Sequence, residues 1–345
     1  MAINILGHFG GKDSFNDGQT VKTKTLYEAL KHKNILKIRT TDTYYIKKNP
    51  FIFIWQVFRG LCVDKTIIVL LSNRGRNVFF PLLYLAARFL GKRVFHYVIG
   101  GKFADDILNN KKMIKYVSSF KGNWLESNLM VQKLNSVGID NAVLIPNFKS
   151  INPLKPENLI CSNQIPFKFC TFSRVMKEKG IENAVYSVMN INKTYQNKIV
   201  SLDIYGPIDD KYNQEFEELM NNVDESIVYK GVVKPEDSVE VLKDYFMLLF
   251  PTAWEGEGIP GTVIDALCAG LPIIASDWTY AKDMLTNGYN ALIYDFDKPE
   301  LLKENILYAI KNHHVINNMK INCVEMAKEY SEDKVVDKIL SELLR

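Results

Sequence analysis

PTAWEGEGIPGTVIDALCAGLPIIAS, residues 251–276, is the stretch that decides the fold of this chain. Glycine is dense in its first half, which lets a loop approach a ligand closely. A helix is predicted from Thr262 to Ala269, and Gly270 is a typical residue to end it. The run PIIAS then predicts a strand. A loop, a helix and a strand in this order form the repeating unit of a parallel α/β sheet.

The same alternation extends from this stretch in both directions. In the second half, strands are predicted over residues 167–173, 200–206, 226–231, 247–250 and 291–295, and helices over 181–190, 210–220, 235–244, 299–312 and 315–344. In the first half, strands are predicted over residues 3–6, 35–38, 66–71, 93–99 and 143–145, and helices over 25–32 and 79–90. Residues 66–71, TIIVLL, have no polar alternation, as a strand of a parallel sheet requires.

A proline-bearing break separates the two series of elements. Residues 149–166 hold three prolines and little periodicity, and they predict a linker. At 345 residues the chain is long enough for two domains. We therefore expect an α/β fold with two doubly wound Rossmann-like domains, over 1–150 and 165–325, that face a cleft. A terminal helix over 326–345 is expected to pack back on the first domain.

Composition excludes several classes of protein. A hydrophobic content of 47% with 24% charged residues is ordinary for a soluble globular chain. No stretch reaches the roughly 18 apolar residues that a membrane span needs, and the opening residues MAINILGHFGGK predict a strand rather than a signal peptide. The five cysteines show no CxxC spacing, which predicts reduced, buried thiols in a cytoplasmic protein.

Charge is distributed unevenly between the two halves. Residues 1–150 hold 23 Lys and Arg against 9 Asp and Glu, whereas residues 151–345 hold 20 against 30. One interpretation is a solvated lysine-rich surface. The other is a first domain that faces phospholipid headgroups or a phosphate-bearing acceptor.

One segment of the basic half has the composition of an interfacial element. Residues 44–60, YYIKKNPFIFIWQVFRG, join aromatic and apolar side chains to Lys47, Lys48 and Arg59. A core helix with solvated lysines accounts for this segment equally well.

Two cations follow the first strand of the second half, in FSRVMKEKG. Arg174 comes directly after the strand, and Lys179 stands beside Gly180 in the same loop. Arg offers a planar fork to phosphate oxygens and Lys offers a point charge, so the pair suits a diphosphate. A charged surface loop is the alternative.

The deciding stretch adds two carboxylates to these cations. Glu257 precedes the predicted helix, and Asp265 lies inside it. One carboxylate can accept the hydroxyls of a ribose and the other those of a sugar, beside Gly258 and the N–H groups of residues 259–262, including Ile259 and Thr262. The alternative is a carboxylate that complements the helix dipole, which fits Glu257 better than Asp265.

Turns after two further strands supply backbone groups to the same edge. Gly206 and Val233 could line a slot for a nucleobase, although glycine ends many strands. No His or Cys cluster has the spacing of a metal site, so no metal is expected.

The order SRxxxEKG, IYG, YKGVV and EGEGIPGTVIDALCAGLPIIASD resembles the retaining GT-B glycosyltransferases of family four, which include many bacterial cell-surface polysaccharide enzymes. The resemblance covers about residues 167–310 closely and the first half more loosely. It implies that Arg174 and Lys179 contact the donor diphosphate, that Glu257 contacts the transferred sugar, and that Asp265 binds the ribose. It also implies that Gly10 and Gly11, in the first-half loop HFGGKDSFNDGQTVKT, lie near the diphosphate, and that no cofactor is needed.

The sequence departs from the family pattern at three places. Asp265 is one methylene shorter than the usual Glu, and Glu255 offers a second register for the role assigned to Glu257. The family often has a His at the end of a mid-domain strand, where this chain has YVIGGKF. His96 is interpreted as a packed strand residue, and His8 is a weaker catalytic candidate.

The resemblance implies a transferase that moves a sugar from a nucleotide sugar to a glycan or a polyprenyl-diphosphate-linked acceptor with retention of configuration. Synthesis of a bacterial capsule or exopolysaccharide is the expected setting. The protein is expected to be cytoplasmic, with a peripheral contact to the anionic inner face of the cell membrane and no nucleic-acid partner. The alternatives are a nucleotide-sugar 2-epimerase and a non-catalytic partner of a membrane or another transferase.

Overall fold

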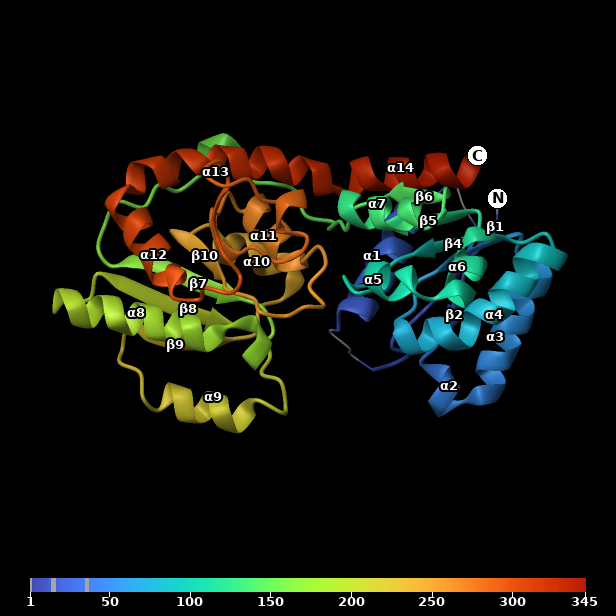
Figure 1. The fold of residues 1–345 in the computed structure, drawn as a ribbon, viewed down its shortest axis with the longest axis horizontal. Coiled ribbons are helices and arrows are strands. Elements are labelled where there is room, and N and C mark those ends of the chain that lie inside the picture. Colours follow the sequence, from blue (N-terminus) through green and yellow to red (C-terminus); the bar gives the residue numbers. More distant parts are fainter. Residues whose placement is uncertain (1, 14–16, 35–36) are drawn as a thin grey trace. The chain divides into compact units, whose positions relative to one another are not determined.

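The computed structural model describes residues 2–13, 17–34 and 37–345 (Figure 1). The chain forms two compact units, each with its own six-stranded parallel sheet. The first unit consists of residues 1–150 and 332–345, and the second unit of residues 151–331. The predicted α/β fold with two Rossmann-like domains is confirmed, and the cleft between them stays a prediction.

The sheet of the first unit has the strand order β2-β1-β3-β4-β5-β6. Its strands are β1 Ala2–Gly7, β2 Lys37–Asp42, β3 Thr66–Val69, β4 Arg93–Tyr97, β5 Gly122–Leu125 and β6 Ala142–Leu144. Its helices are α1 Gly18–His32, α2 Tyr45–Lys48, α3 Pro50–Val63, α4 Asn73–Phe89, α5 Phe103–Leu108, α6 Lys111–Ser118 and α7 Asn128–Ser136. Every residue of β3 is buried, as the uninterrupted apolar run predicted. Residues 35–36 of the predicted second strand lie outside the described residues.

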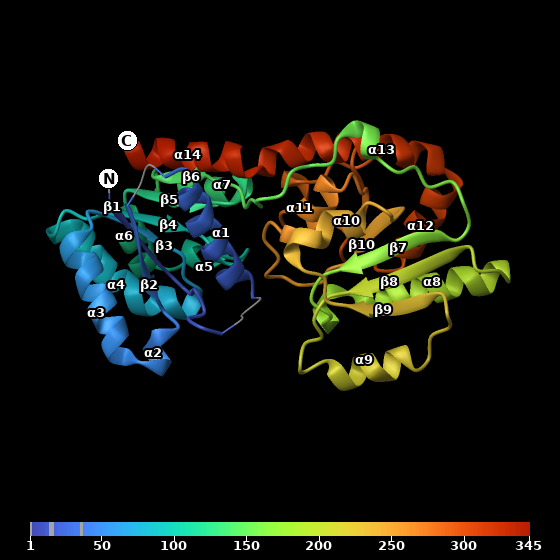
Figure 2. The ribbon, with the colours of Figure 1, turned by 180° about the vertical axis from the view of Figure 1, so that it is seen from behind.

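The last helix of the chain, α14 Glu332–Leu344, completes the core of the first unit (Figure 2). Val336, Ile339 and Leu343 are fully buried there beside Leu26 of α1. The helix predicted over 315–344 is therefore wrong as a single element: α13 His313–Ala327 belongs to the second unit, and α14 begins only at Glu332. Ser331 is extended and precedes two acidic residues, which is a typical start for a new helix.

The second sheet has the order β12-β11-β10-β7-β8-β9. Its strands are β7 Phe167–Phe172, β8 Val200–Tyr205, β9 Ile227–Gly231, β10 Met247–Phe250, β11 Ile273–Ser276 and β12 Ala291–Tyr294. The remaining helices of the second unit are α8 Ile181–Tyr195, α9 Asn213–Met220, α10 Ser238–Leu242, α11 Gly261–Cys268 and α12 Leu301–Lys311. Each predicted strand of this half is present within about two residues of its expected bounds.

The segment interpreted as a linker, residues 149–166, packs against the second unit. Leu154 donates its N–H to the carbonyl of Cys268 at 2.8 Å, and Ser162 donates to the side chain of Asn317 at 3.1 Å. The prolines break regular structure here without releasing the chain from the domain. The second unit consequently begins at Ile151 rather than at residue 165.

The cysteines are only partly as expected. Cys170, Cys268 and Cys323 are buried thiols, but Cys62 and Cys161 are exposed. Cys62 lies on the outer side of α3, and Cys161 lies in the extended segment ahead of β7, so neither site offers a core position. Among the described helices, none has the length and apolarity to cross a bilayer.

Candidate functional site

The loops after β7 and β10 carry the predicted charged residues, and the topology of the second sheet brings these loops together. β7 and β10 are neighbours, and the strand order reverses between them. Ligands of open parallel sheets bind outside the strand carboxyl ends at such a reversal. The N–H of Ala253 donates to the carbonyl of Glu178 at 2.7 Å and joins the two loops directly.

Lys179 and Glu257 form an ion pair across this junction. The Lys179 ammonium donates to Oε2 of Glu257, and the hydroxyl of Thr252 donates to the same oxygen at 3.0 Å. Lys179 is 9% exposed and Glu257 is 5% exposed. The sequence singled out both residues, but it did not predict that they contact each other.

Aromatic rings complete the surroundings of the Lys179 ammonium. Its nitrogen lies 5.4 Å from the ring centre of Phe250 and 4.9 Å from that of Trp254, within cation–π range. Trp254 itself is 42% exposed and forms the outer wall. A buried charge of this kind depends on its partner, because loss of one member leaves the other unpaired in a poorly solvating environment.

Two glycines permit the close approach of the loops. Gly180 has a φ of +68°, and a Cβ there would lie 2.0 Å from the carbonyl oxygen of Pro251. Gly206, after β8, has a φ of +130°, and a Cβ there would lie 1.8 Å from the carbonyl oxygen of Ser173. A side chain at either position would push the loops apart.

Arg174 differs from Lys179 in its surroundings. Its side chain is 45% exposed, and its guanidinium lies 3.7 Å from the carboxylate of Asp209. The sequence indicated no difference in burial between the two cations, whereas the structure buries Lys179 and leaves Arg174 accessible to a ligand. Asp209 was not singled out, since it lies in a turn whose approach to β7 depends on the tertiary fold.

The amino end of α11 is one source of backbone N–H groups. The helix begins at Gly261 with Pro260 as its N-cap, so the expected run of four N–H groups over residues 259–262 is wrong at Pro260, which has none. Most first-turn N–H groups of a helix lack intrahelical partners, although here the N–H of Val263 donates to the carbonyl of Pro260 at 3.1 Å. Thr262 donates its hydroxyl to the carbonyl of Phe172 at 2.6 Å, and the carbonyl of Gly258 accepts from the Trp278 indole at 3.1 Å.

The three carboxylates of the deciding stretch lie in different environments. Asp265 is the fifth residue of α11 and is 2% exposed, beyond the first turn where a helix dipole acts. Glu255 is exposed, whereas Glu257 is buried against Lys179. This contrast favours Glu257 over Glu255 for the role that the sequence left open, and the roles themselves stay predictions.

The predicted base-binding turns also lie at this edge. Gly206 donates its N–H to the carbonyl of Gly231 at 2.9 Å, and its own carbonyl accepts from the Tyr229 hydroxyl at 2.9 Å. Val233 is half-buried two residues after β9. The turns are therefore fixed to each other beside the loop that carries Arg174.

The glycine loop of the first unit is held by a residue that the sequence did not reveal. Asp42, at the end of β2, accepts the N–H of Phe9 and the N–H of Gly11, each at 2.9 Å. Gly10 and Gly11 both have positive φ values, +81° and +56°. Because Asp42 already binds the Gly11 amide, a donor phosphate would have to displace this carboxylate to use that group. Residues 14–16 of the loop lie outside the described residues.

A chain of polar groups connects His8 to the start of α1. Nδ1 of His8 lies 2.7 Å from the hydroxyl of Thr20, which donates to the carboxylate of Asp17 at 2.6 Å. Burial opposes ionisation of Asp17, but bonds from Thr20 and Gln19 outweigh it and the pKa of Asp17 is lowered. Asp17 is also the N-cap of α1, so this chain has a structural purpose.

His96 is a packed core residue, as interpreted from the sequence. It is fully buried, and its ring centre lies 4.8 Å from that of Phe80 and 4.9 Å from that of Phe103. Burial, together with the nearby Arg76 charge, holds the pKa of His96 well below its ordinary value. The ring is therefore neutral near pH 7.

A second buried ion pair lies in the first unit, and sequence reasoning missed it. The ammonium of Lys22, on α1, donates to Glu126 after β5 and to the carbonyl of Val98 at 2.7 Å, and it lies 3.6 Å from the ring centre of Tyr97. Burial lowers the pKa of Lys22, and the attraction of Glu126 only partly offsets this. No spacing signal links residues 104 apart in the chain.

Within the described ranges, no three His, Cys, Asp or Glu side chains are grouped as a metal site would require.

The second unit has a counterpart among known families. Residues 162–330 match the family described as "Glycosyl transferases group 1", so this part of the chain is similar to the proteins of that family.

The whole chain is similar to known glycosyltransferases at low identity. An uncharacterized glycosyltransferase of Methanocaldococcus jannaschii is 23% identical over 88% of this chain and 81% of its own length. The alpha-galactosylglucosyldiacylglycerol synthase of Streptococcus pneumoniae is 24% identical over 60% of this chain, which covers only 56% of that protein. The crystal structure of Anabaena HepE in complex with UDP superposes with a TM-score of 0.72 at 13% identity, over 99% of both chains. The fold is therefore that of the GT-B glycosyltransferases.

Proposed function

We propose that this protein transfers a sugar from a nucleotide-sugar donor to a glycan or lipid-linked acceptor, with retention of the anomeric configuration, in the synthesis of a cell-surface polysaccharide. The observation that carries the proposal is the buried Lys179–Glu257 pair between the loops after β7 and β10. An accessible Arg174 and the amino end of α11 lie at the same sheet edge. Cations and helix-start N–H groups at one edge form a site for a diphosphate.

Each group of this edge has a role in the proposal. Lys179 and Thr252 both donate to Oε2 of Glu257, so we assign Oε1 to the hydroxyls of the transferred sugar. Arg174, Lys179 and the α11 N–H groups stabilise the charge that builds on the leaving diphosphate. Asp265 accepts the ribose hydroxyls, and no metal takes part. Attack on the same face as the departing phosphate, assisted by that phosphate, would retain the configuration.

A panel of nucleotide sugars tests this proposal. The protein is incubated with UDP-, GDP- and ADP-sugars and a glycan acceptor, and release of nucleoside diphosphate is followed. UDP-sugars are the first to test, because HepE, which shares the fold over its whole length, was crystallised in complex with UDP. NMR of the product then gives the anomeric configuration.

The panel also separates the alternatives. A 2-epimerase would change the sugar of the donor without needing an acceptor. A non-catalytic partner would bind the nucleotide and release nothing. Inversion of configuration would contradict the proposed mechanism while leaving the transferase class intact.

We further propose an acceptor carried on a polyprenyl diphosphate at the cytoplasmic face of the cell membrane, met through a peripheral contact with anionic lipid. The basic balance of residues 1–150 supports this, since each Lys or Arg near an anionic bilayer contributes about 1 kcal/mol. The diacylglycerol named in the pneumococcal relative points in the same direction. Replacement of Lys47, Lys48 and Arg59 by Glu should reduce binding to anionic liposomes while donor binding stays unchanged.

A further inference from the structure

Helix α3 is apolar around almost its whole circumference, yet it is mostly exposed. Its sequence PFIFIWQVFRGLCV has two polar side chains, and Gly60 is its single buried residue. Phe51 is 84% exposed, Phe58 66% and Trp55 57%. A helix of this composition normally lies in a core or in a lipid environment.

Helix α4 presents a second exposed apolar row that the sequence analysis did not identify. Val78, Leu82, Leu85 and Phe89 are spaced as one helical face, and all are exposed. The opposite face of α4 holds Phe79, Phe80, Leu83 and Ala86, which are buried. The helix is thus apolar toward the core and again toward solvent.

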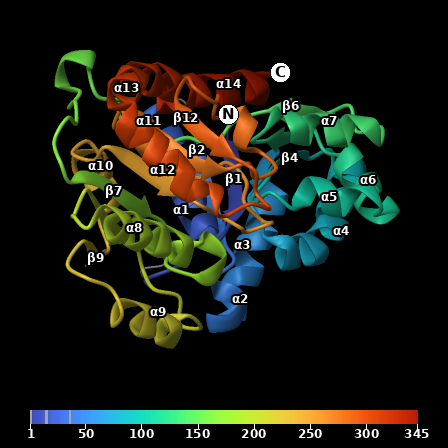
Figure 3. The same cartoon turned by 60° about the vertical axis from the view of Figure 1, so that its left-hand side comes forward.

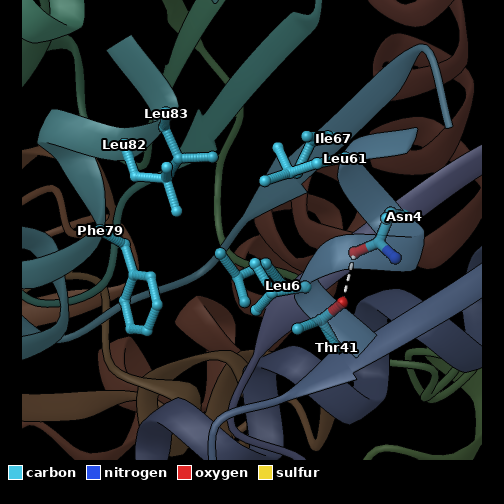
Figure 4. Close-up of a pocket in the computed structure, with 10 residues that line it drawn as sticks. Asn4, Leu6, Thr41, Leu61, Ile67, Phe79, Leu82 and Leu83 are labelled. Atoms are coloured by element: carbon cyan, nitrogen blue, oxygen red, sulfur yellow. Dashed lines mark hydrogen bonds between the residues drawn. The ribbon is translucent and has the colours of Figure 1, made fainter. Parts of the chain in front are cut away.

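The two helices lie side by side on the first unit (Figure 3), and residues of both line one pocket. The rings of Phe53 and Phe79 meet edge to face at 5.6 Å. Between the helices lies a pocket whose lining is mainly apolar, with Leu61 from α3 and Leu82 and Leu83 from α4 (Figure 4). Leu82 lines this pocket and is also 40% exposed, so the pocket opens next to the outer row of α4.

Cations outnumber acids in the segment that carries this surface, although Arg76 of α4 is buried and Asp106 lies near it. Residues 43–104 contain ten Lys and Arg and a single acid, Asp64. Asp64 is buried and bound to Arg39, so it offers no negative charge to a partner. On the neighbouring α6, the exposed Lys115 lies 5.3 Å from the ring of Tyr84 on α4.

We propose that α3 and α4 together form a bilayer-docking surface, in which the outer rows of both helices enter the acyl boundary of an anionic membrane while the surrounding cations contact lipid phosphates. The biological purpose of this surface rests on the proposed lipid-linked acceptor. Binding of the protein to a bilayer can nevertheless be measured separately from catalysis. Exposed apolar side chains gathered on neighbouring helices of a monomer mark an interaction site. The excess of cations in this segment favours an anionic bilayer over a neutral protein surface as the partner. Exposed apolar residues of the second unit, by contrast, are dispersed over many elements.

The test uses vesicles of equal parts phosphatidylglycerol and phosphatidylcholine. Wild-type protein should sediment with them at low salt, and L85S with F89S should weaken this partition by about tenfold, because two side chains lose their burial in the acyl boundary. A matched control is Y195S with Y308S, which removes two similarly exposed aromatic rings from the second unit. The control should bind as wild type does.

Depth of insertion gives a second readout that does not depend on mutating α4. Trp55 should be quenched by lipids with brominated acyl chains, and W55F should remove that quenching. Donor turnover with a water-soluble acceptor should be unchanged in all these variants, so a failed transferase proposal and a failed docking proposal give different results. Wild-type protein that stays in the supernatant, α4 variants that bind normally, or variants that alter only the oligomeric state would each overturn the docking surface.

Discussion

Each unit of this protein buries one Lys–Glu pair near the carboxyl ends of its strands, and the two pairs differ in what surrounds them. Lys22 has Glu126, a backbone carbonyl and the fully buried Tyr97 as neighbours. Lys179 has Glu257 together with Trp254, whose ring is 42% exposed.

The Lys22–Glu126 pair is buried in the core of the first unit. The Lys179–Glu257 pair is separated from solvent by the ring of Trp254. The Lys22–Glu126 pair holds α1 against the ends of β4 and β5. A pair beneath a solvent-exposed ring can exchange part of its contacts for those of a ligand. Burial of a charged pair is therefore a poor guide to function until its outermost neighbour is known.

The largest effect is expected at the Lys22–Glu126 pair. K22A should lower the free energy of unfolding by about 3–5 kcal/mol, because Glu126 is left buried without its partner. Urea unfolding and hydrogen exchange of the β4 and β5 amides measure this. K22M combined with E126L should recover most of the loss, while nucleotide affinity stays at the wild-type value in the soluble double variant. A double variant that loses donor binding would mean that this pair also serves the ligand.

The next effect concerns the pair beneath Trp254. E257Q should reduce turnover of the full donor more than it reduces binding of the bare nucleotide, since Glu257 is assigned to the sugar. K179A should weaken transfer through loss of a charge-assisted bond to the diphosphate worth roughly 1.5–3 kcal/mol, and it should also destabilise the second unit by leaving Glu257 unpaired.

The double variant K179M with E257L sharpens the contrast between the two pairs. It should restore the thermal stability of the second unit without restoring turnover, unlike its counterpart in the first unit. Calorimetry and steady-state kinetics on the same preparations measure both quantities. Equal rescue of stability and turnover would make the second pair structural as well.

Arg174 gives a cleaner but smaller test. Because its side chain is 45% exposed and its ion pair with Asp209 is long at 3.7 Å, R174A should leave the melting temperature nearly unchanged. Transfer should still fall, toward the lower end of the roughly 1.5–3 kcal/mol range of a charge-assisted bond. D209N serves as the control, since it removes the partner and keeps the cation. A variant R174A with wild-type kinetics would remove Arg174 from the diphosphate site.

Asp265 and Glu255 complete the series. D265N should weaken binding of free nucleoside diphosphate by about tenfold, the size of one lost hydrogen bond, as measured by titration calorimetry. E255Q should change neither binding nor turnover, because this carboxylate is an exposed part of the loop between β10 and α11. If E255Q instead shows the pattern expected for E257Q, the residue that contacts the transferred sugar is Glu255 and not Glu257.

Periodicity and spacing were sufficient for the second sheet and its motif, and for five strands of the first sheet, but they missed β5 Gly122–Leu125. The strand at residues 66–71 and the loop, helix and strand of residues 251–276 are local patterns, and local patterns carry through to the structure. Contacts between distant residues were not readable. Asp42 is separated by about thirty positions from the loop that it holds, and the outer row of α4 is evident only once its inner row is known to be buried. Ser331 fits the sequence pattern of one long helix, but its extended backbone separates α13 from α14.

The position of α14 has a consequence for synthesis of the protein on the ribosome. Domains usually fold in order as the chain emerges, but the first unit lacks Val335, Val336, Ile339 and Leu343 of its core until the second unit has been made. Its α1 side must therefore stay incomplete while about 180 further residues are translated. The unit that begins first is completed last, and the second unit can fold before it.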